Sequence, residues 1–305
     1  MKHPSWSWSI RSWACLKWLL LLAMCLPPCE LWSQPVGITD DRGVEVRLHQ
    51  PARRIVCLHG GLSDVLLALG MGRVIAGRTT ADDETPALAH IPAVGTHLRP
   101  NLELILSLGP DLVLQHAGRE EAGEPLLALE ALQIPTAAFV MDDFPALFAT
   151  MERVALLVDA GQEGARRIQD LRDRLAAVQR RTQNLERPAV LVEIRYPNLL
   201  VAGRGSLASH IVEAAGGRQV VTEDARHVRL SEETLLRLNP QVCLMQRGPM
   251  NPNPEPYVNR PHFQHLDCVK HQRVLVVEGQ KFARTGPGAV EAVEELARWL
   301  HGGAQ

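Results

Sequence analysis

Short apolar runs alternate with segments of helical spacing along most of the chain. Such alternation is typical of a parallel sheet covered by helices, so the pattern predicts an α/β fold. The strand-like runs are residues 54–58, 73–77, 111–115, 135–140, 189–194, 199–203, 241–246 and 273–278. The segments with helical spacing are residues 62–71, 101–108, 121–132, 144–158, 206–215, 231–238 and 287–301.

Two segments depart from this alternation. Residues 163–185 are rich in charges, contain few breakers and have a single apolar stripe at Ala165, Ile168, Leu171, Leu175 and Val178. A helix of about twenty residues spans roughly 30 Å, so this one suits either a surface helix over the sheet or a rigid strut between two halves. Residues 247–261 contain five prolines and predict an irregular loop.

An internal repeat relates the two halves of the chain. Residues 103–114 align with residues 233–244 at a constant offset, and the initial Glu, two Leu, the Pro and the final Leu are shared. A weaker match sets residues 62–75 beside residues 207–220. Two repeated units in the same order predict two similar lobes. We therefore expect lobes at 34–160 and 188–305, joined by a bridging helix at 161–187.

The first 33 residues have the features of an export signal. Basic residues precede a short apolar run at 18–26 and a Pro-Pro breaker, which predicts a secretory signal peptide and a periplasmic protein. The run is about half the length that spans a bilayer. Residues 22–25 also resemble a bacterial lipobox, although Met24 stands where a small residue is usual, so lipid attachment at Cys25 remains open.

Charge and cysteine content narrow the functional classes. The formal net charge is −2, which argues against nucleic-acid binding because phosphate recognition usually needs a basic excess. Outside the leader the cysteines are Cys57, Cys243 and Cys268. Cys57 and Cys243 lie in apolar runs, so we expect both to be buried small side chains. A Cys243–Cys268 disulfide is compatible with an oxidising compartment, but the spacing does not decide it.

Several motifs in order resemble one known family. They are residues 51–58 with 64–70, then 94–95, 101–103 and 108–113, then 200–203 with 214–217. Together they resemble the periplasmic solute-binding proteins of vitamin B12, haem and ferric-siderophore ABC importers. The resemblance covers about residues 40–300. It implies a class III fold, in which two Rossmann-like lobes with parallel sheets are bridged by one long α-helix and hold a ligand between them. It also implies a monomer that delivers a metal chelate to a permease dimer.

The resemblance implies a function for the first glutamate of each repeat. In this family a surface Glu on each lobe docks onto arginines of the permease dimer, and the matching positions here are Glu103 and Glu233. The alternative is that both are ordinary first-turn glutamates, favoured by the helix dipole. Glu232 is the nearest competitor in the second half.

Basic and aromatic side chains gather after the predicted strands. In open α/β sheets ligands bind beyond the carboxyl ends of the strands, and clustered Arg and His create a positive field there. This predicts an anionic ligand: a ferric siderophore first, with cobalamin, haem or an oxyanion as alternatives. His59 and Tyr196 are also candidate axial ligands of a haem iron. The candidate ligand-binding residues are His59, His97, His116, Arg195, Tyr196, Arg204, Arg247 and Arg284.

No motif indicates catalysis. The sequence has no Gly-x-Ser-x-Gly elbow, no phosphate loop and no His-Glu-x-x-His, so we expect no catalytic residue, no metal site of the protein's own and no cofactor. The acidic pairs at 82–83 and 142–143 read as turn or cap residues. An exported metal-dependent hydrolase that uses the histidines is the alternative from another functional class.

Overall fold

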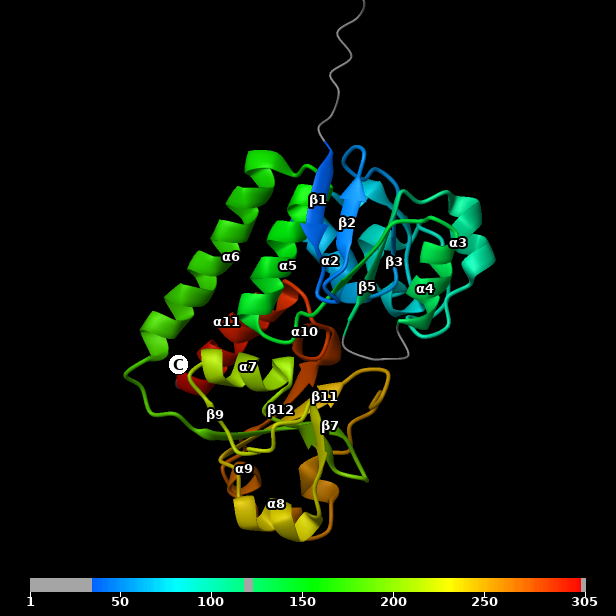
Figure 1. Cartoon of the computed structure of the whole chain (residues 1–305). Coiled ribbons are helices and arrows are strands. Elements are labelled where there is room, and N and C mark those ends of the chain that lie inside the picture. The colour runs from blue at the N-terminus through cyan, green and yellow to red at the C-terminus, as the bar shows by residue number, and fades with distance from the viewer. Residues whose placement is uncertain (1–34, 118–122, 303–305) are drawn as a thin grey trace, which may run out of the picture. The chain divides into compact units, whose positions relative to one another are not determined.

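The computed structural model describes residues 35–117 and 123–302. The predicted signal peptide and Cys25 lie outside these residues. Two sheets, one from each half of the chain, carry the fold (Figure 1). None of the helices in the described ranges combines the length and the apolar character that crossing a bilayer requires.

The first half contains a parallel four-stranded sheet with the order β4-β3-β5-β6. It is preceded by an antiparallel hairpin of β1 and β2. The strands are β1 (Val36–Thr39), β2 (Glu45–Leu48), β3 (Ile55–Cys57), β4 (Ile75–Gly77), β5 (Leu112–His116) and β6 (Thr136–Phe139). The helices are α2 (Gly60–Ala68), α3 (Leu102–Leu108), α4 (Glu124–Ala131) and α5 (Phe144–Leu157), with 3₁₀ turns η1 (Gly72–Val74), η2 (Thr80–Asp82) and η3 (Pro86–Leu88).

The second half contains a mixed sheet with the order β10-β8-β7-β11-β12, and β9 also pairs with β7. Its strands are β7 (Ala189–Arg195), β8 (Leu200–Ala202), β9 (Arg218–Gln219), β10 (His227–Arg229), β11 (Val242–Arg247) and β12 (Val274–Glu278). Its helices are α7 (Leu207–Ala214), α8 (Glu232–Leu238), α9 (Asp267–Lys270), α10 (Gly279–Phe282) and α11 (Gly288–His301). The predicted loop 247–261 is irregular except for η5 (Tyr257–Asn259), and η6 (Phe263–His265) follows it.

The prediction of a wholly parallel sheet is wrong for the second half. Strands β8 and β10 run antiparallel to their neighbours. The reason is the connection at 196–199, because four residues can form a hairpin but not the crossover that parallel strands require.

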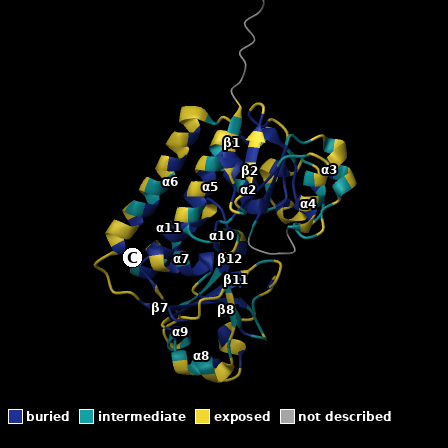
Figure 2. Ribbon diagram, in the orientation of Figure 1, coloured by how far each residue is buried: buried dark blue, intermediate teal, exposed yellow. Residues whose placement is uncertain are grey.

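Helix α6 (Gly161–Thr182) is the predicted long helix, and it contacts helices of both halves. It lies beside α5 from the first half and beside α11 and α7 from the second (Figures 1 and 2). Its buried stripe runs through Gly164, Ile168, Leu175 and Val178, whereas the predicted Ala165 is exposed. The helix is therefore a surface helix and a connection between the halves at the same time.

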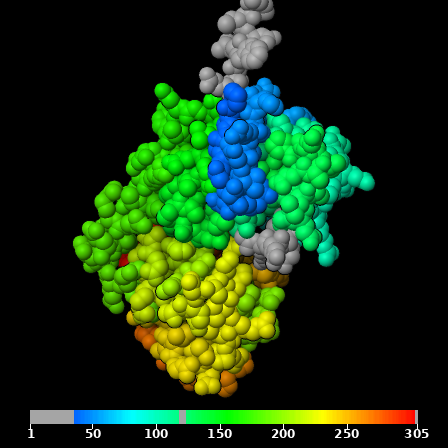
Figure 3. All heavy atoms as spheres, viewed as in Figure 1, coloured from blue at the N-terminus to red at the C-terminus, as the bar shows by residue number. Residues whose placement is uncertain are grey.

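One apolar core runs under α6 through both halves. It joins Leu66 of α2 and Val154 of α5 to Leu175 of α6, Val192 of β7 and Leu296 of α11. The described residues, 35–117 and 123–302, accordingly form one compact unit, and the space-filling view shows the first half in close contact with residues of the second (Figure 3). A shared core of this kind opposes wide separation of the two sheets.

The internal repeat is reproduced in three dimensions. Helices α3 and α8 begin after Asn101 and Ser231, whose side chains cap them, and end at Gly109 and Asn239, both in the left-handed conformation. Each helix is followed by Pro and then by a buried strand, β5 or β11. The same local signals therefore build the same helix–strand unit twice.

Candidate functional site

Three predicted histidines lie together beside the carboxyl ends of the first sheet. His59 follows β3 and His116 is the last residue of β5, and their ring centroids are 4.8 Å apart. His97 comes from the loop before α3, with its ring 6.4 Å from that of His59 and nearly perpendicular to it. The sequence expectation that these side chains converge at one sheet edge holds for this trio.

Hydrogen bonds fix the positions of the trio. The side chain of Gln115, buried in β5, donates to the His97 carbonyl at 2.9 Å and accepts from the His116 amide at 2.9 Å. His59 caps α2, because its Nδ1 accepts a bond from the Gly61 amide at 3.2 Å. That bond requires a lone pair on Nδ1, so the neutral ring carries its proton on Nε2.

An acidic side chain joins the trio to the second half. Asp142 follows β6, and its Oδ1 lies 3.6 Å from Nε2 of His116. The same oxygen lies 3.2 Å from the guanidinium of Arg226, which precedes β10. Asp143, by contrast, is a helix cap as the sequence predicts, since it accepts from the Ala146 amide at 2.7 Å. Polar groups from both halves thus meet at Asp142.

The field around His59 is positive. Burial is the main cause that holds the pKa of His59 well below its usual value, and the charges of His116, Arg284, His97 and Arg226 act in the same direction. Burial would raise the pKa of Asp142, but its bond to His116 and the charge of Arg226 lower it overall. The site therefore combines a neutral His59 with an ionised Asp142 in surroundings that disfavour a further positive charge.

Arg284 has a different environment from the one predicted. Its guanidinium is ion-paired with Asp82 and, at 2.6 Å, with Asp64, and it donates to the Gly60 carbonyl at 2.7 Å. A Cβ on Gly61 would overlap the Thr285 carbonyl oxygen, so glycine is needed for this close approach. Asp82 also accepts from the Ser63 hydroxyl at 3.0 Å. Arg284 thus links the second half to the first, and its charge is already balanced.

The other predicted residues of the second half have partners of their own or are exposed. Arg195 donates to the Asn198 amide oxygen at 3.1 Å, and Arg247 lies 3.5 Å from Glu278. Arg204 is exposed and follows β8, which is antiparallel, so the argument from parallel strand ends does not apply to it. The Tyr196 ring lies 4.0 Å from the guanidinium carbon of Arg260.

Glu103 and Glu233 occupy the same position on equivalent helices. Each is exposed in the first turn, of α3 and α8 respectively. Neither forms an ion pair with any residue in the described ranges. Both carboxylates are accessible to a partner.

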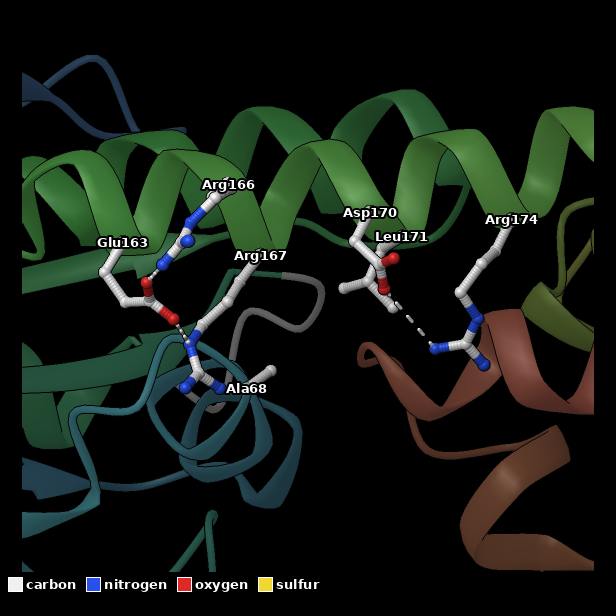
Figure 4. Close-up of a pocket in the computed structure, with 7 residues that line it drawn as sticks. All are labelled: Ala68, Glu163, Arg166, Arg167, Asp170, Leu171 and Arg174. Atoms are coloured by element: carbon white, nitrogen blue, oxygen red, sulfur yellow. Dashed lines mark hydrogen bonds and ion pairs between the residues drawn. The ribbon is translucent and has the colours of Figure 1, made fainter.

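A surface pocket of about 380 Å³ lies where α6 passes α2, away from the histidines (Figure 4). Its charged side chains are largely paired with one another, as in Arg167 with Glu163 at 2.8 Å and Arg174 with Asp170 at 3.9 Å. Arg174 also bonds to Glu294 of α11 at 2.8 Å. These contacts hold helices together and leave little unbalanced charge for a ligand.

No group of three His, Cys, Asp or Glu side chains in the described part of the chain is arranged to hold a metal ion. The His59 and His116 rings are tilted by 34° to each other, and His97 is edge-on to His59. What the site offers is hydrogen bonding, one shared carboxylate and a positive field, which suit recognition of a polar or anionic molecule.

Comparison with known proteins gives consistent matches. The family model described as "Periplasmic binding protein" matches residues 55–280. A Bacillus subtilis relative named as an uncharacterized ABC transporter substrate-binding lipoprotein is 24% identical over 274 residues, covering 88% of this chain and 86% of the relative. A vitamin B12-binding protein of Photorhabdus laumondii is 24% identical over 263 residues, covering 83% and 90%.

Solved structures show the same fold. A structure titled as an ABC-type Fe³⁺-hydroxamate transport system from Saccharomonospora viridis superposes with a TM-score of 0.70 at 24% identity, covering 88% of this chain and 99% of that one. The superposition covers most of this chain, so the architecture described above is a known fold.

Proposed function

Because the chain belongs to the periplasmic binding protein family, we propose that it is the extracytoplasmic substrate-binding component of an ABC importer. The proposal includes export by the signal peptide at residues 1–33, with lipid attachment at Cys25 as an open alternative. The halves on either side of α6, residues 34–160 and 188–305, act as the two lobes that hold the ligand.

The observation that carries the proposal is the meeting of the halves at Asp142. His116 from the first half and Arg226 from the second contact the same carboxylate, and His59 and His97 lie beside them. A ligand that enters here contacts both halves at once. Displacing Asp142 from Arg226 frees a guanidinium for charge-assisted hydrogen bonds to the ligand.

The positive field favours an anionic ligand, and we propose a ferric siderophore or a related iron chelate. An anion bound beside His59 would offset the charges that add to the effect of burial on its pKa. Arg195, Arg204 and Arg247 form the outer part of the proposed site. Arg284 belongs to it as a support rather than a direct contact, because two carboxylates already neutralise it.

Cobalamin and haem are the alternatives within the same family. Tyr257 and Phe282, two aromatic side chains of the second half, are buried in the core, whereas Tyr196 is partly exposed. A thin aromatic surface is poor for stacking a flat macrocycle. Haem would be held through coordination by His59 and Tyr196.

The ligand is identified from protein purified from its own host. Native mass spectrometry and the absorption spectrum distinguish a ferric chelate, haem and a corrinoid, and thermal shift with each pure compound ranks them, since a ligand that binds only the native state raises Tm. A rise with ferric chelates supports the main proposal, and a rise with haem or cobalamin alone supports the alternative. Turnover of a substrate without ligand-dependent stabilisation would contradict the receptor role.

Docking to a permease is the second part of the proposal, with Glu103 and Glu233 as the contacts. Two equivalent carboxylates, one in each half, suit a receptor with twofold symmetry. Glu103→Lys with Glu233→Lys is expected to abolish uptake and leave ligand affinity unchanged. Glu232→Lys, one position away on the same helix, is the matched control. Lost ligand affinity in the double variant would mean that these residues belong to the binding site.

A further inference from the structure

Two of the three described cysteines lie side by side in the second half. The Sγ atoms of Cys243, in β11, and Cys268, in α9, are 2.6 Å apart, closer than the van der Waals contact of two sulfur atoms. Both side chains are completely buried. Cys57 is also buried but lies in β3 of the other sheet.

The backbone holds this pair in register without help from the sulfurs. The Cys243 amide donates to the Arg273 carbonyl at 3.0 Å, and the Arg273 amide donates to the Cys268 carbonyl at 2.7 Å. The Cys268 amide donates to the Pro240 carbonyl at 3.1 Å. A disulfide, about 2.05 Å long, would require the two sulfur atoms to approach by only about 0.5 Å.

We propose that Cys243 and Cys268 form a disulfide in the exported protein. The inference rests on the export in the proposed function and is independent of the ligand. The two thiols lose two protons and two electrons to the disulfide of a thiol oxidoreductase, which becomes a dithiol, and the S–S bond forms by exchange through a mixed disulfide.

The bond forms before the second half closes. Burial raises the pKa of the Cys243 thiol well above its usual value, and the adjacent Cys268 thiol adds to the effect. Exchange requires a thiolate, which is scarce in the folded protein. For the same reason the completed disulfide is inaccessible to a reductant until the protein unfolds.

The crosslink anchors the segment that carries the most buried ion pair of the second half. Cys243 and Cys268 are 25 residues apart in the sequence, and Arg260 lies between them. Arg260 is paired with Glu193 at 2.8 Å, and both side chains are completely buried. The rings of Tyr196 and Tyr257 lie 4.0 and 4.3 Å from the Arg260 guanidinium carbon. The disulfide thus holds this loop against Tyr196, a residue of the proposed ligand site.

Alkylation mapping tests the proposal on protein exported with its own leader. The protein is unfolded in guanidinium with iodoacetamide and no reductant, then digested and analysed by mass spectrometry. The expected result is alkylated Cys57 and a linked peptide of Cys243 and Cys268, two mass units below the sum of its reduced parts. Alkylation of all three cysteines would overturn the proposal, and it would leave the importer function untouched.

Stability gives a second, independent readout. Closing a loop of this size should raise Tm by about 5–10 °C, so unfolding and refolding under reductant should lower Tm by that amount. The matched control, Cys57→Ala, should respond like the native protein, whereas Cys243→Ala with Cys268→Ala should not respond. Equal responses in all three would contradict the proposal. Should the double variant fail to fold, the alkylation map still decides.

Discussion

Two arginines of the second half, Arg284 and Arg226, form ion pairs with the first half, and they differ in exposure and in hydrogen bonding. Arg284 has 11% of its side chain exposed and is paired with Asp82, which is fully buried. Arg226 and its partner Asp142 are 38% and 30% exposed. Arg284 also bonds to the carbonyls of Gly60 and Ala81, whereas the guanidinium of Arg226 pairs with Asp142, which it shares with His116.

The difference indicates which contact can open. Breaking a buried pair leaves an uncompensated charge in the interior, whereas a half-exposed pair exchanges its partner for water at a lower cost. The ion pairs of Arg284 should accordingly stay closed and form a fixed joint between the halves, whereas a ligand can displace the ion pair of Arg226. Opening for ligand entry should widen the space around Asp142 and leave Asp82 in place.

The largest effect is expected from removing the fixed joint. Arg284→Met leaves Asp82 buried without its partner and should lower the free energy of unfolding by about 3–5 kcal/mol. Arg226→Met is the matched control and should cost less than about 1 kcal/mol. Urea denaturation of both variants measures the comparison, and equal losses would refute it.

The second largest effect is expected from Asp64→Asn, which should raise the free energy of unfolding. Burial raises the pKa of Asp64 to about 6 despite the opposing charge of Arg284. A carboxyl with a raised pKa is destabilising when ionised, so native stability falls as pH rises from about 4 to 6. The amide keeps a bonding group for Arg284 and should stabilise the protein by about 1–2 kcal/mol at pH 7, after discounting for partial exposure, and by nothing near pH 4. A gain that is constant with pH would contradict this account.

The third test uses His59, because the charges of both arginines lower its pKa. Its pKa is lowered in the folded state, so the unfolded chain takes up a proton first and stability falls as pH drops below about 6.5. His59→Asn retains a cap for α2 and should remove up to about 1.4 kcal/mol per pH unit of that dependence. Denaturation between pH 5.5 and 7.5 measures the slope. Identical slopes in both proteins would show that His59 is not held neutral.

The smallest effect concerns the displaceable contact. Asp142→Asn removes the carboxylate that competes with an anionic ligand for Arg226, and should tighten binding by up to about fivefold. Isothermal titration with the identified ligand measures this change. Asp143→Asn, a cap substitution one residue away, is the control. Weaker binding in Asp142→Asn would mean that the carboxylate itself contacts the ligand.

Local patterns predicted much of this fold. The strand-like runs and helical spacing located most elements, and the repeat placed Glu103 and Glu233 on equivalent helices. The convergence of His59 and His116 followed from the geometry of parallel strands. The antiparallel direction of β8 could also have been predicted, because the four-residue connection between β7 and β8 is too short for a crossover.

Long-range pairings could not be predicted in this way. Nothing near Arg284 in the sequence indicates that Asp64 and Asp82, about 200 residues away, neutralise it. Arg226 was missed for the same reason, and Asp142 was read together with Asp143 although only the latter caps a helix. These partners depend on how the two sheets pack, which no local pattern specifies.

The continuous core under α6 has a consequence for transport. If the halves can shift only slightly, empty and loaded molecules present nearly the same outer surface to the permease, including the proposed docking residues Glu103 and Glu233. Empty copies would then compete with loaded ones for the same docking position. Producing the receptor in excess over its cargo should therefore slow import instead of accelerating it.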